Sequence, residues 1–158
     1  MYLKKKDMVR IEFIVQGSDE VMKWMNDNWV NKTEDGLKET IGYTGGDSVE
    51  KLNHNVVSDQ EFWVSCESED FVPQQFLESL QDYLKDNVYS NVLIQGEYWD
   101  DQDTLVGVFY INEGGWEYEE GYVDENSDEW EENNPDGFYY DEVIRPMIDE
   151  LKEELGQP

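Results

Sequence analysis

The sequence predicts an α+β fold in which helices cover one face of an antiparallel sheet. Several runs of strand length alternate apolar with polar residues, and two stretches between them repeat apolar residues every three or four positions, as amphipathic helices do. In the C-terminal half the strand-like runs follow one another through short turn sequences, which is typical of antiparallel hairpins. The chain has 158 residues, of which 38% are apolar and 14% aromatic, and this suffices for one domain with its own core.

The first strand is predicted over residues 8–16, where apolar residues occupy every second position. A helix follows Ser18, whose hydroxyl can accept from a free amide of the first turn, and runs to about Trp29. Its apolar positions recur at helical spacing and are expected in the core: Val21, Trp24, Met25 and residues 28–29. The polar, Gly-rich segment 30–48 is predicted to be a loop, with a short strand considered for residues 37–43.

A pair of strands and a second helix are predicted next. Residues 51–57 carry only a weak pattern, whereas residues 61–67 have one apolar face. The side chains of that face, which we expect in the core, are Phe62, Val64 and Cys66. Pro73 suits the first turn of the following helix, because its missing amide would have had no partner there. This helix should end near Asn87, and its apolar stripe consists of Phe76, Leu77, Leu80, Tyr83 and Leu84.

Three further strands are predicted in a stretch without positive charge, since no Lys or Arg occurs between Lys85 and Arg145. The first two cover residues 91–99 and 104–112, and residues 100–103 join them as a hairpin loop. The third covers residues 116–123. Because side chains alternate across a strand, one face of this third strand should be largely aromatic and the other mostly acidic.

The end of the chain is predicted to form an acidic loop and a last helix. The loop, residues 124–137, begins like a calcium-binding loop but has Glu129 where Gly is needed and Pro135 where Glu is needed. Weak, nonspecific binding of Ca²⁺ or Mg²⁺ stays open. The helix covers residues 138–155, and Pro146 leaves two alternatives: the helix begins near position 144 with Pro146 in its first turn, or it kinks there.

This order of elements is that of a ferredoxin-like α+β sandwich, with helices on one face of the sheet. Residues 8–115 would form its core. Residues 116–158 would extend the same domain by an acidic strand, a loop and a C-terminal helix.

Three segments of this core also carry a family resemblance. They read VRIEFIVQGSDEVMKWM, FWVSCESEDFVPQQFLESL and VLIQGEYWDDQDTLVGVFYI. Together they resemble the ferredoxin-like domain of the Api92-like and YubB-like proteins of phages and plasmids, over roughly residues 8–115. The resemblance implies an origin in a mobile element and a binding role rather than an enzymatic one, and that family supplies no established catalytic residue.

Charge and reactive residues restrict the function. The formal net charge of -28 excludes nucleic acid and anionic membranes as direct partners and favours a basic one. Cys66 is the only cysteine and His54 the only histidine, and the sequence indicates neither a disulfide framework nor a catalytic triad. We therefore predict no enzyme and no catalytic, cofactor or metal site. No apolar run approaches the length of a membrane span, and a cytoplasmic protein is expected.

The main prediction is a protein that binds and inhibits a basic nucleic-acid-binding host or defence protein by presenting carboxylates in place of phosphates, as a DNA mimic. The alternatives are an immunity-type protein that neutralises a cognate basic toxin, an acidic housekeeping domain and, least favoured, an enzyme. The residues expected to bind the partner are Glu97, Trp99, Asp100, Asp101, Asp103, Trp116, Glu117, Glu119, Glu120, Asp124, Asp128, Glu129, Trp130, Glu131 and Glu132.

The aromatic residues are expected to divide into two populations. One should be buried, namely Trp24, Phe62, Phe76 and Phe109. Some of a second set, namely Trp99, Trp116, Trp130, Tyr139 and Tyr140, should be exposed beside carboxylates, because Trp and Tyr commonly anchor interfaces.

Overall fold

The structure is a computed structural model of the whole chain. It describes residues 8–69, 71–88, 91–100, 105–112, 115–122 and 144–156. Of the predicted loop at residues 100–103, only Asp100 is described, and it is the last residue of a strand. The predicted loop at residues 124–137 lies outside these ranges, and so does the beginning of the predicted last helix.

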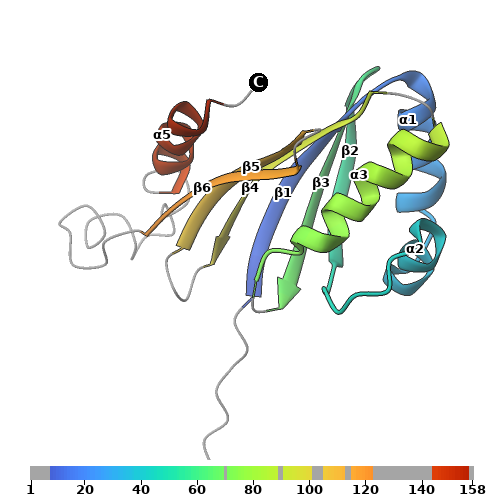
Figure 1. Cartoon of the computed structure of the whole chain (residues 1–158), viewed down its shortest axis with the longest axis horizontal. Coiled ribbons are helices and arrows are strands. Elements are labelled where there is room, and N and C mark those ends of the chain that lie inside the picture. Colours follow the sequence, from blue (N-terminus) through green and yellow to red (C-terminus); the bar gives the residue numbers. More distant parts are fainter. Residues whose placement is uncertain are drawn as a thin grey trace, which may run out of the picture.

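The fold is α+β, as predicted, and its centre is a six-stranded antiparallel sheet (Figure 1). The strands lie in the order β2-β3-β1-β4-β5-β6. Their bounds are β1 Met8–Gln16, β2 Glu50–Ser58, β3 Glu61–Glu69, β4 Leu93–Asp100, β5 Leu105–Asn112 and β6 Gly115–Tyr122. The six predicted strands are thereby confirmed, and β6 continues the sheet beyond β5.

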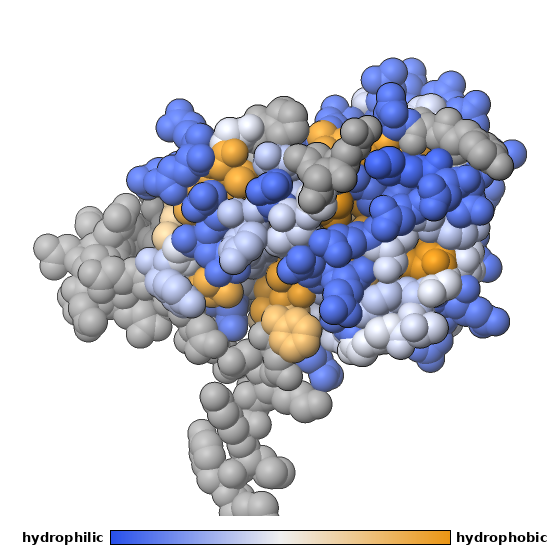
Figure 2. All heavy atoms as spheres, viewed as in Figure 1, coloured by the Kyte–Doolittle hydropathy of each residue, from blue (hydrophilic) through white to orange (hydrophobic). Residues whose placement is uncertain are grey.

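One face of the sheet is covered by a helix layer, seen in front of β1 to β3 in Figure 1. Its elements are α1 Asp19–Trp24, the π-helix η1 Met25–Trp29, α2 Glu34–Ile41 and α3 Gln74–Val88. The main core lies between this layer and the sheet. Phe62, Phe76 and Phe109 are buried there as predicted, whereas Trp24 is only half-buried. On the side seen in Figure 2, hydrophilic residues cover most of the described surface, and the hydrophobic areas are small and separate.

The helix α2 shows that the prediction of a loop over residues 30–48 is wrong. Thr33 caps this helix, since its hydroxyl accepts from the amide of Gly36 at 3.1 Å. Gly42 ends it in the left-handed conformation, with φ of 74°, which costs glycine least. Only two residues of the helix, Leu37 and Ile41, are buried, so its hydrophobic pattern is too short to stand out.

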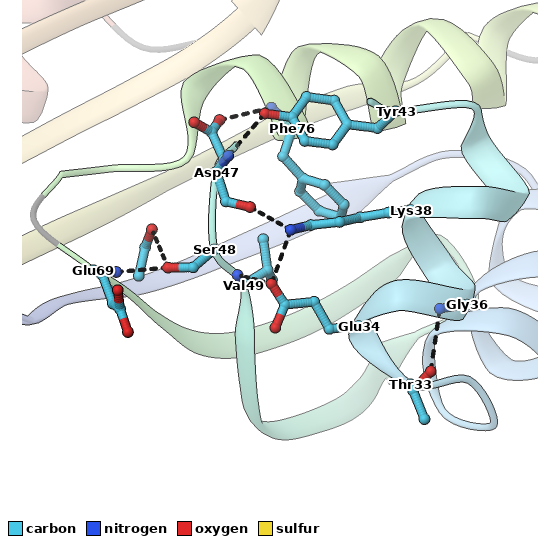
Figure 3. Close-up of polar contacts among 11 residues, drawn as sticks. Thr33, Glu34, Gly36, Lys38, Tyr43, Asp47, Ser48, Val49, Glu69 and Phe76 are labelled. Carbon is cyan, nitrogen blue, oxygen red and sulfur yellow. Dashed lines mark hydrogen bonds and ion pairs between the residues drawn. The ribbon is translucent and has the colours of Figure 1, made fainter. Parts of the chain in front are cut away.

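The segment after α2 is held in place by polar contacts to two helices (Figure 3). Asp47 is buried, and its Oδ2 accepts from the amide of Phe76 at 3.1 Å, which satisfies a free donor in the first turn of α3. The amide of Asp47 donates to the hydroxyl of Tyr43, and Lys38 donates to its carbonyl. Glu34 accepts from the amide of Val49 at 2.7 Å. These contacts explain why a Gly-rich segment keeps one conformation.

The opposite face of the sheet carries the C-terminal helix, α5 Arg145–Leu155, which Figure 1 shows apart from the other helices. It packs on β5 and β6 and forms a second core with Trp99, Val106 and Val108. The prediction that helices lie on one face is therefore incomplete. Pro146 stands in the first turn, so the alternative with a start near residue 144 is the correct one, and Gly156 closes the helix. Among the described helices, none is long and apolar enough to cross a membrane.

Candidate partner-binding surface

The last described strand, β6, presents two chemically different faces. Trp116, Tyr118, Glu120 and Tyr122 lie on the side of the main core, because they pair with β5 residues that face it. Tyr118 and Tyr122 are 53% and 69% exposed, so this side of β6 extends beyond the helix layer into solvent. The other side carries acidic residues and Gly121, which leaves room for Met147 of α5. The predicted aromatic and acidic faces are therefore present.

Two of the aromatic residues fix β6 to the sheet instead of standing free. The ring of Trp116 stacks on Phe109, with centroids 4.4 Å apart and planes 12° apart. The hydroxyl of Tyr98 donates to Glu120 Oε1 at 2.5 Å across the intervening strand β5. Burial and the charge of Glu120 raise the pKa of Tyr98, so this phenol keeps its proton and remains a donor.

On the other side of the sheet, the positive charges of α5 turn inward. Arg145 Nη1 donates to Glu97 Oε1 at 2.8 Å, and Lys152 Nζ lies 3.2 Å from Glu97 Oε2. The side chain of Glu97 is only 8% exposed, and its charge is compensated by these two cations. The seven-residue spacing of Arg145 and Lys152 places both on one side of the helix.

The outward side of α5 is consequently acidic. Its exposed side chains include Asp149, Glu150, Glu153 and Glu154. Of these, Asp149 lies 3.6 Å from Arg145 Nη2 and is itself 61% exposed. Together with Glu117 and Glu119, which lie on the α5 side of β6, these residues form what we call the β6–α5 surface. Its described carboxylates outnumber its two cations, and both cations point at Glu97.

Two lysines elsewhere in the described part of the chain also make contacts within the protein. Lys51 donates to the carbonyls of Trp29 and Lys32, and burial lowers its pKa. Lys38 pairs with Glu34 at 3.0 Å and donates to the carbonyl of Asp47. Lys51 belongs to β2, at the opposite edge of the sheet from β6, so its charge is distant from the carboxylates of the β6–α5 surface.

The structure places the predicted partner-binding residues in three groups. Glu117 and Glu120 are exposed, while Trp116 and Glu119 are half-buried. Glu97, Trp99 and Asp100 are buried, so the expectation that they stand on the surface is wrong. Trp99 packs under α5 and Glu97 binds its cations. The remaining residues lie outside the described ranges: Asp101, Asp103, Asp124, Asp128, Glu129, Trp130, Glu131 and Glu132.

Some residues of β6 and α5 were not among the predicted partner-binding residues. Tyr118 and Tyr122 are the exposed aromatic residues of β6; alternation along the strand placed them on the predicted aromatic face, but they were not predicted to bind the partner. No sequence pattern indicates that the side chains of Arg145 and Lys152 point toward the sheet, because Glu97, which both of them bind, is distant in sequence. The acids of α5 were not among the residues predicted to bind the partner.

The described residues offer little reactive chemistry. Burial raises the pKa of Cys66 to about 12, so this thiol is a packing residue and not a nucleophile. Within the described ranges, no group of three or more His, Cys, Asp or Glu side chains could hold a metal ion.

Comparison of the chain with protein-family models, with curated protein sequences and with solved structures gives no match in any of the three. The resemblance to Api92-like and YubB-like proteins therefore stays a prediction. What the chain does has to be argued from its own geometry and charge.

Proposed function

We propose that this chain is a non-enzymatic binding protein of phage or mobile-element origin, which binds and inhibits a basic nucleic-acid-binding protein in the host cytoplasm. The observation that carries the proposal is the direction of the charges on α5. Both of its cations bind the buried Glu97, while its exposed carboxylates and those of β6 point outward. With a net charge of -28, such a surface attracts a basic partner and repels nucleic acid.

The density of charge supports competition with nucleic acid. β6 has 8 residues and is therefore roughly 26 Å long. The carboxylates of the β6–α5 surface number six (two on β6 and four on α5), or one per roughly 4 Å of strand. Duplex DNA carries one charge per roughly 1.7 Å of axis and each single strand one per roughly 3.4 Å. The described residues thus match one strand, and mimicry of a full duplex requires further acids.

The exposed tyrosines supply what charge alone does not. Tyr118 and Tyr122 offer large contact areas at little cost in conformational entropy. We propose that carboxylates accelerate the encounter with the partner and that these tyrosines prolong the complex.

We also propose that β1 to β4, with α1 to α3, form a ferredoxin-like unit. The support is the order β2-β3-β1-β4, with antiparallel pairing throughout and helices between β1 and β2 and between β3 and β4. β5 and β6 then extend this sheet past β4, and α5 covers the far side of the extension. The proposed binding surface thus lies on the added part and not on the unit itself.

Affinity capture from a host lysate, followed by a DNA competition assay, tests the proposed function. The captured protein should be basic, should bind DNA on its own, and should be displaced from a labelled duplex by this chain. A partner that is captured but stays on DNA would instead favour the immunity-type alternative. A chain that captures no basic protein would contradict both.

Two charge-matched variants show whether the effect comes from the β6–α5 surface. The surface variant replaces exposed acids of that surface: Glu117→Gln, Glu150→Gln and Glu154→Gln. The control variant replaces exposed acids of β2, α2 and α3: Glu50→Gln, Glu39→Gln and Asp82→Asn. Each removes three negative charges from the same total of -28, so a difference between them reports the position of the charges. Displacement of DNA should weaken only in the surface variant.

A further inference from the structure

A pocket of about 620 Å³ lies between α5 and the outer face of the sheet, which is the face opposite the helix layer. Its floor is formed by side chains of three neighbouring strands, β3, β1 and β4. Its wall is formed by α5 from Arg145 to Gly156. The partner-binding surface proposed above lies on the outward side of α5, so the pocket is a distinct site, although Glu153 belongs to both.

The pocket is lined by a half-buried carboxyl group, Glu12, with which no described residue forms an ion pair. Glu12 of β1 stands directly opposite Glu97 of β4 and opposite Ser65 of β3. Glu97 takes both cations of α5, whereas Glu12 makes no hydrogen bond or ion pair with a described residue. Ser65 is fully buried, and its hydroxyl has no hydrogen-bond partner among the described residues.

The described charges around Glu12 include both signs, but no described cation forms an ion pair with it. The carboxylates in the pocket lining are Glu12, Glu97 and Glu153, against Arg145 and Lys152. The pKa of Glu12 is raised, first by burial and then by the charge of Glu97, while Arg10 and Arg145 oppose the rise. A cation beside Glu12 would meet a carboxylate with which no described residue forms an ion pair.

The neighbouring part of the pocket is apolar. Ile14 and Trp63 form a direct cross-strand pair and line the pocket beside Glu12. Ile14 follows Glu12 on the same side of β1, at about 7 Å along the strand, which is comparable to the extended length of a four-carbon stem. The indole of Trp63 is the aromatic ring that attracts organic cations most strongly. The polar part of the pocket at Glu12 and its apolar part at Ile14 and Trp63 are therefore close enough for one small ligand to contact both.

We propose that this pocket binds an organic cation, an ammonium or guanidinium group on an aliphatic stem, with Glu12 as its carboxylate and with Ile14 and Trp63 against the stem. An anion is disfavoured by the net charge of -28 and because Arg145 and Lys152 already bind Glu97. The cation has two sources with the same chemistry: a free small molecule, or a Lys or Arg side chain of a protein. The site does not depend on the proposed function, which rests on the outward carboxylates.

Binding at this site is coupled to the protonation of Glu12. A cation pairs with the ionised carboxylate, so it displaces the proton that burial and Glu97 favour. Affinity should therefore fall as the pH is lowered through the raised pKa of Glu12, and binding in that range should release protons.

The test uses n-butylguanidinium as the probe and two-dimensional NMR of the whole chain as the readout. Saturable shifts should appear at Glu12, Ile14 and the indole N–H of Trp63. Butyrate, which has a similar stem and the opposite charge, should not produce them. Guanidinium without a stem should bind more weakly, because it cannot cover Ile14 and Trp63.

Two variants with the same change of charge decide the role of Glu12. Glu12→Gln should weaken n-butylguanidinium about tenfold or more, as expected for the loss of one charge-assisted hydrogen bond. Glu39→Gln, on the exposed side of α2, should leave the affinity unchanged. Shifts that do not saturate, or that respond equally to both variants, would mean general attraction to an acidic protein and would overturn the site.

A short peptide, acetyl-Gly-Arg-Gly-amide, distinguishes the two sources of the cation. If it produces the same shifts as n-butylguanidinium, the pocket accepts a side chain presented by a protein backbone. If only the free cation binds, the site takes a small molecule. Failure of both probes would overturn the inference and leave the proposed partner-binding function standing.

Discussion

The hydroxyl of Tyr98 reaches Glu120 by passing over Gly107, the residue that separates them in the central strand of three. A Cβ atom on Gly107 would collide with Cζ of the Tyr98 ring, so only glycine leaves enough space for this ring. This contact links β4, β5 and β6 across the part of the sheet that carries the β6–α5 surface.

Gly107→Ala and Tyr98→Phe should therefore both destabilise the fold. The added methyl group displaces a buried ring and should cost about 1–3 kcal/mol. Loss of the hydroxyl should cost about 1 kcal/mol, because Glu120 is exposed and regains water. Urea unfolding measures both. Gly46→Ala, where nothing lies within 4 Å of the new atom, is the control and should change stability by less than about 0.5 kcal/mol. Equal effects at Gly107 and Gly46 would contradict this packing.

Glu97→Gln should loosen α5. The substitution leaves Arg145 and Lys152 without their common carboxylate, yet both cations are a third or more exposed and can be hydrated. We expect a loss of about 1–3 kcal/mol, less than for a fully buried pair. Hydrogen exchange should accelerate in α5 before the rest of the chain. Asp149→Asn removes an exposed partner at 3.6 Å and should have almost no effect, so similar losses in both variants would contradict the assignment.

Glu12→Gln should stabilise the chain at neutral pH. A carboxyl group with a raised pKa in the folded state takes up protons on folding, so its contribution favours folding at low pH. That contribution is lost as the pH rises through the raised pKa. The gain of the variant over the unmodified chain should therefore be present at neutral pH and vanish below the usual pKa of 4.5. Glu39→Gln corrects for the removal of one charge, and a Glu12 variant less stable than this control at pH 7 would refute the prediction.

Tyr118→Ala and Tyr122→Ala should shorten the life of the complex with the partner. Both side chains are more than half exposed, so their loss should leave the fold intact and remove contact area. We expect dissociation to become about tenfold faster for at least one of them, with little change in association. Trp116→Ala is unsuitable for this test because Trp116 stacks on Phe109 inside the structure. Unchanged dissociation in both variants would exclude the tyrosines as anchors.

Local patterns predicted the sheet well. In β3 the alternation of Phe62, Val64 and Cys66 identified the core face, and all three are fully buried. The stripe of α3 was equally legible, because its apolar residues recur over four turns. In contrast, α2 offers two buried residues, and its signals are the cap at Thr33 and the turn at Gly42. Periodicity alone cannot detect so short a helix.

The candidate site could be predicted only in part, because its arrangement depends on where α5 packs. Trp99 lies on the face of β4 opposite the main core. Because all helices were predicted on the other face of the sheet, Trp99 was expected to be exposed. The burial of Trp99 and the pairing of Glu97 with Arg145 arise from contacts between residues more than forty positions apart. Such long-range contacts leave no periodic trace in the sequence.

The rate of association with the captured partner, measured as a function of salt, tests the central claim most directly. If the carboxylates of the β6–α5 surface steer the encounter, the rate should fall about tenfold or more between about 50 and about 500 mM salt, as screening shortens the reach of the charges. Replacing Glu117, Glu150 and Glu154 by Gln should slow association and flatten this dependence, while the control variant with the same net charge should follow the unmodified chain. An association rate that is indifferent to salt, or that responds equally to both variants, would contradict the account.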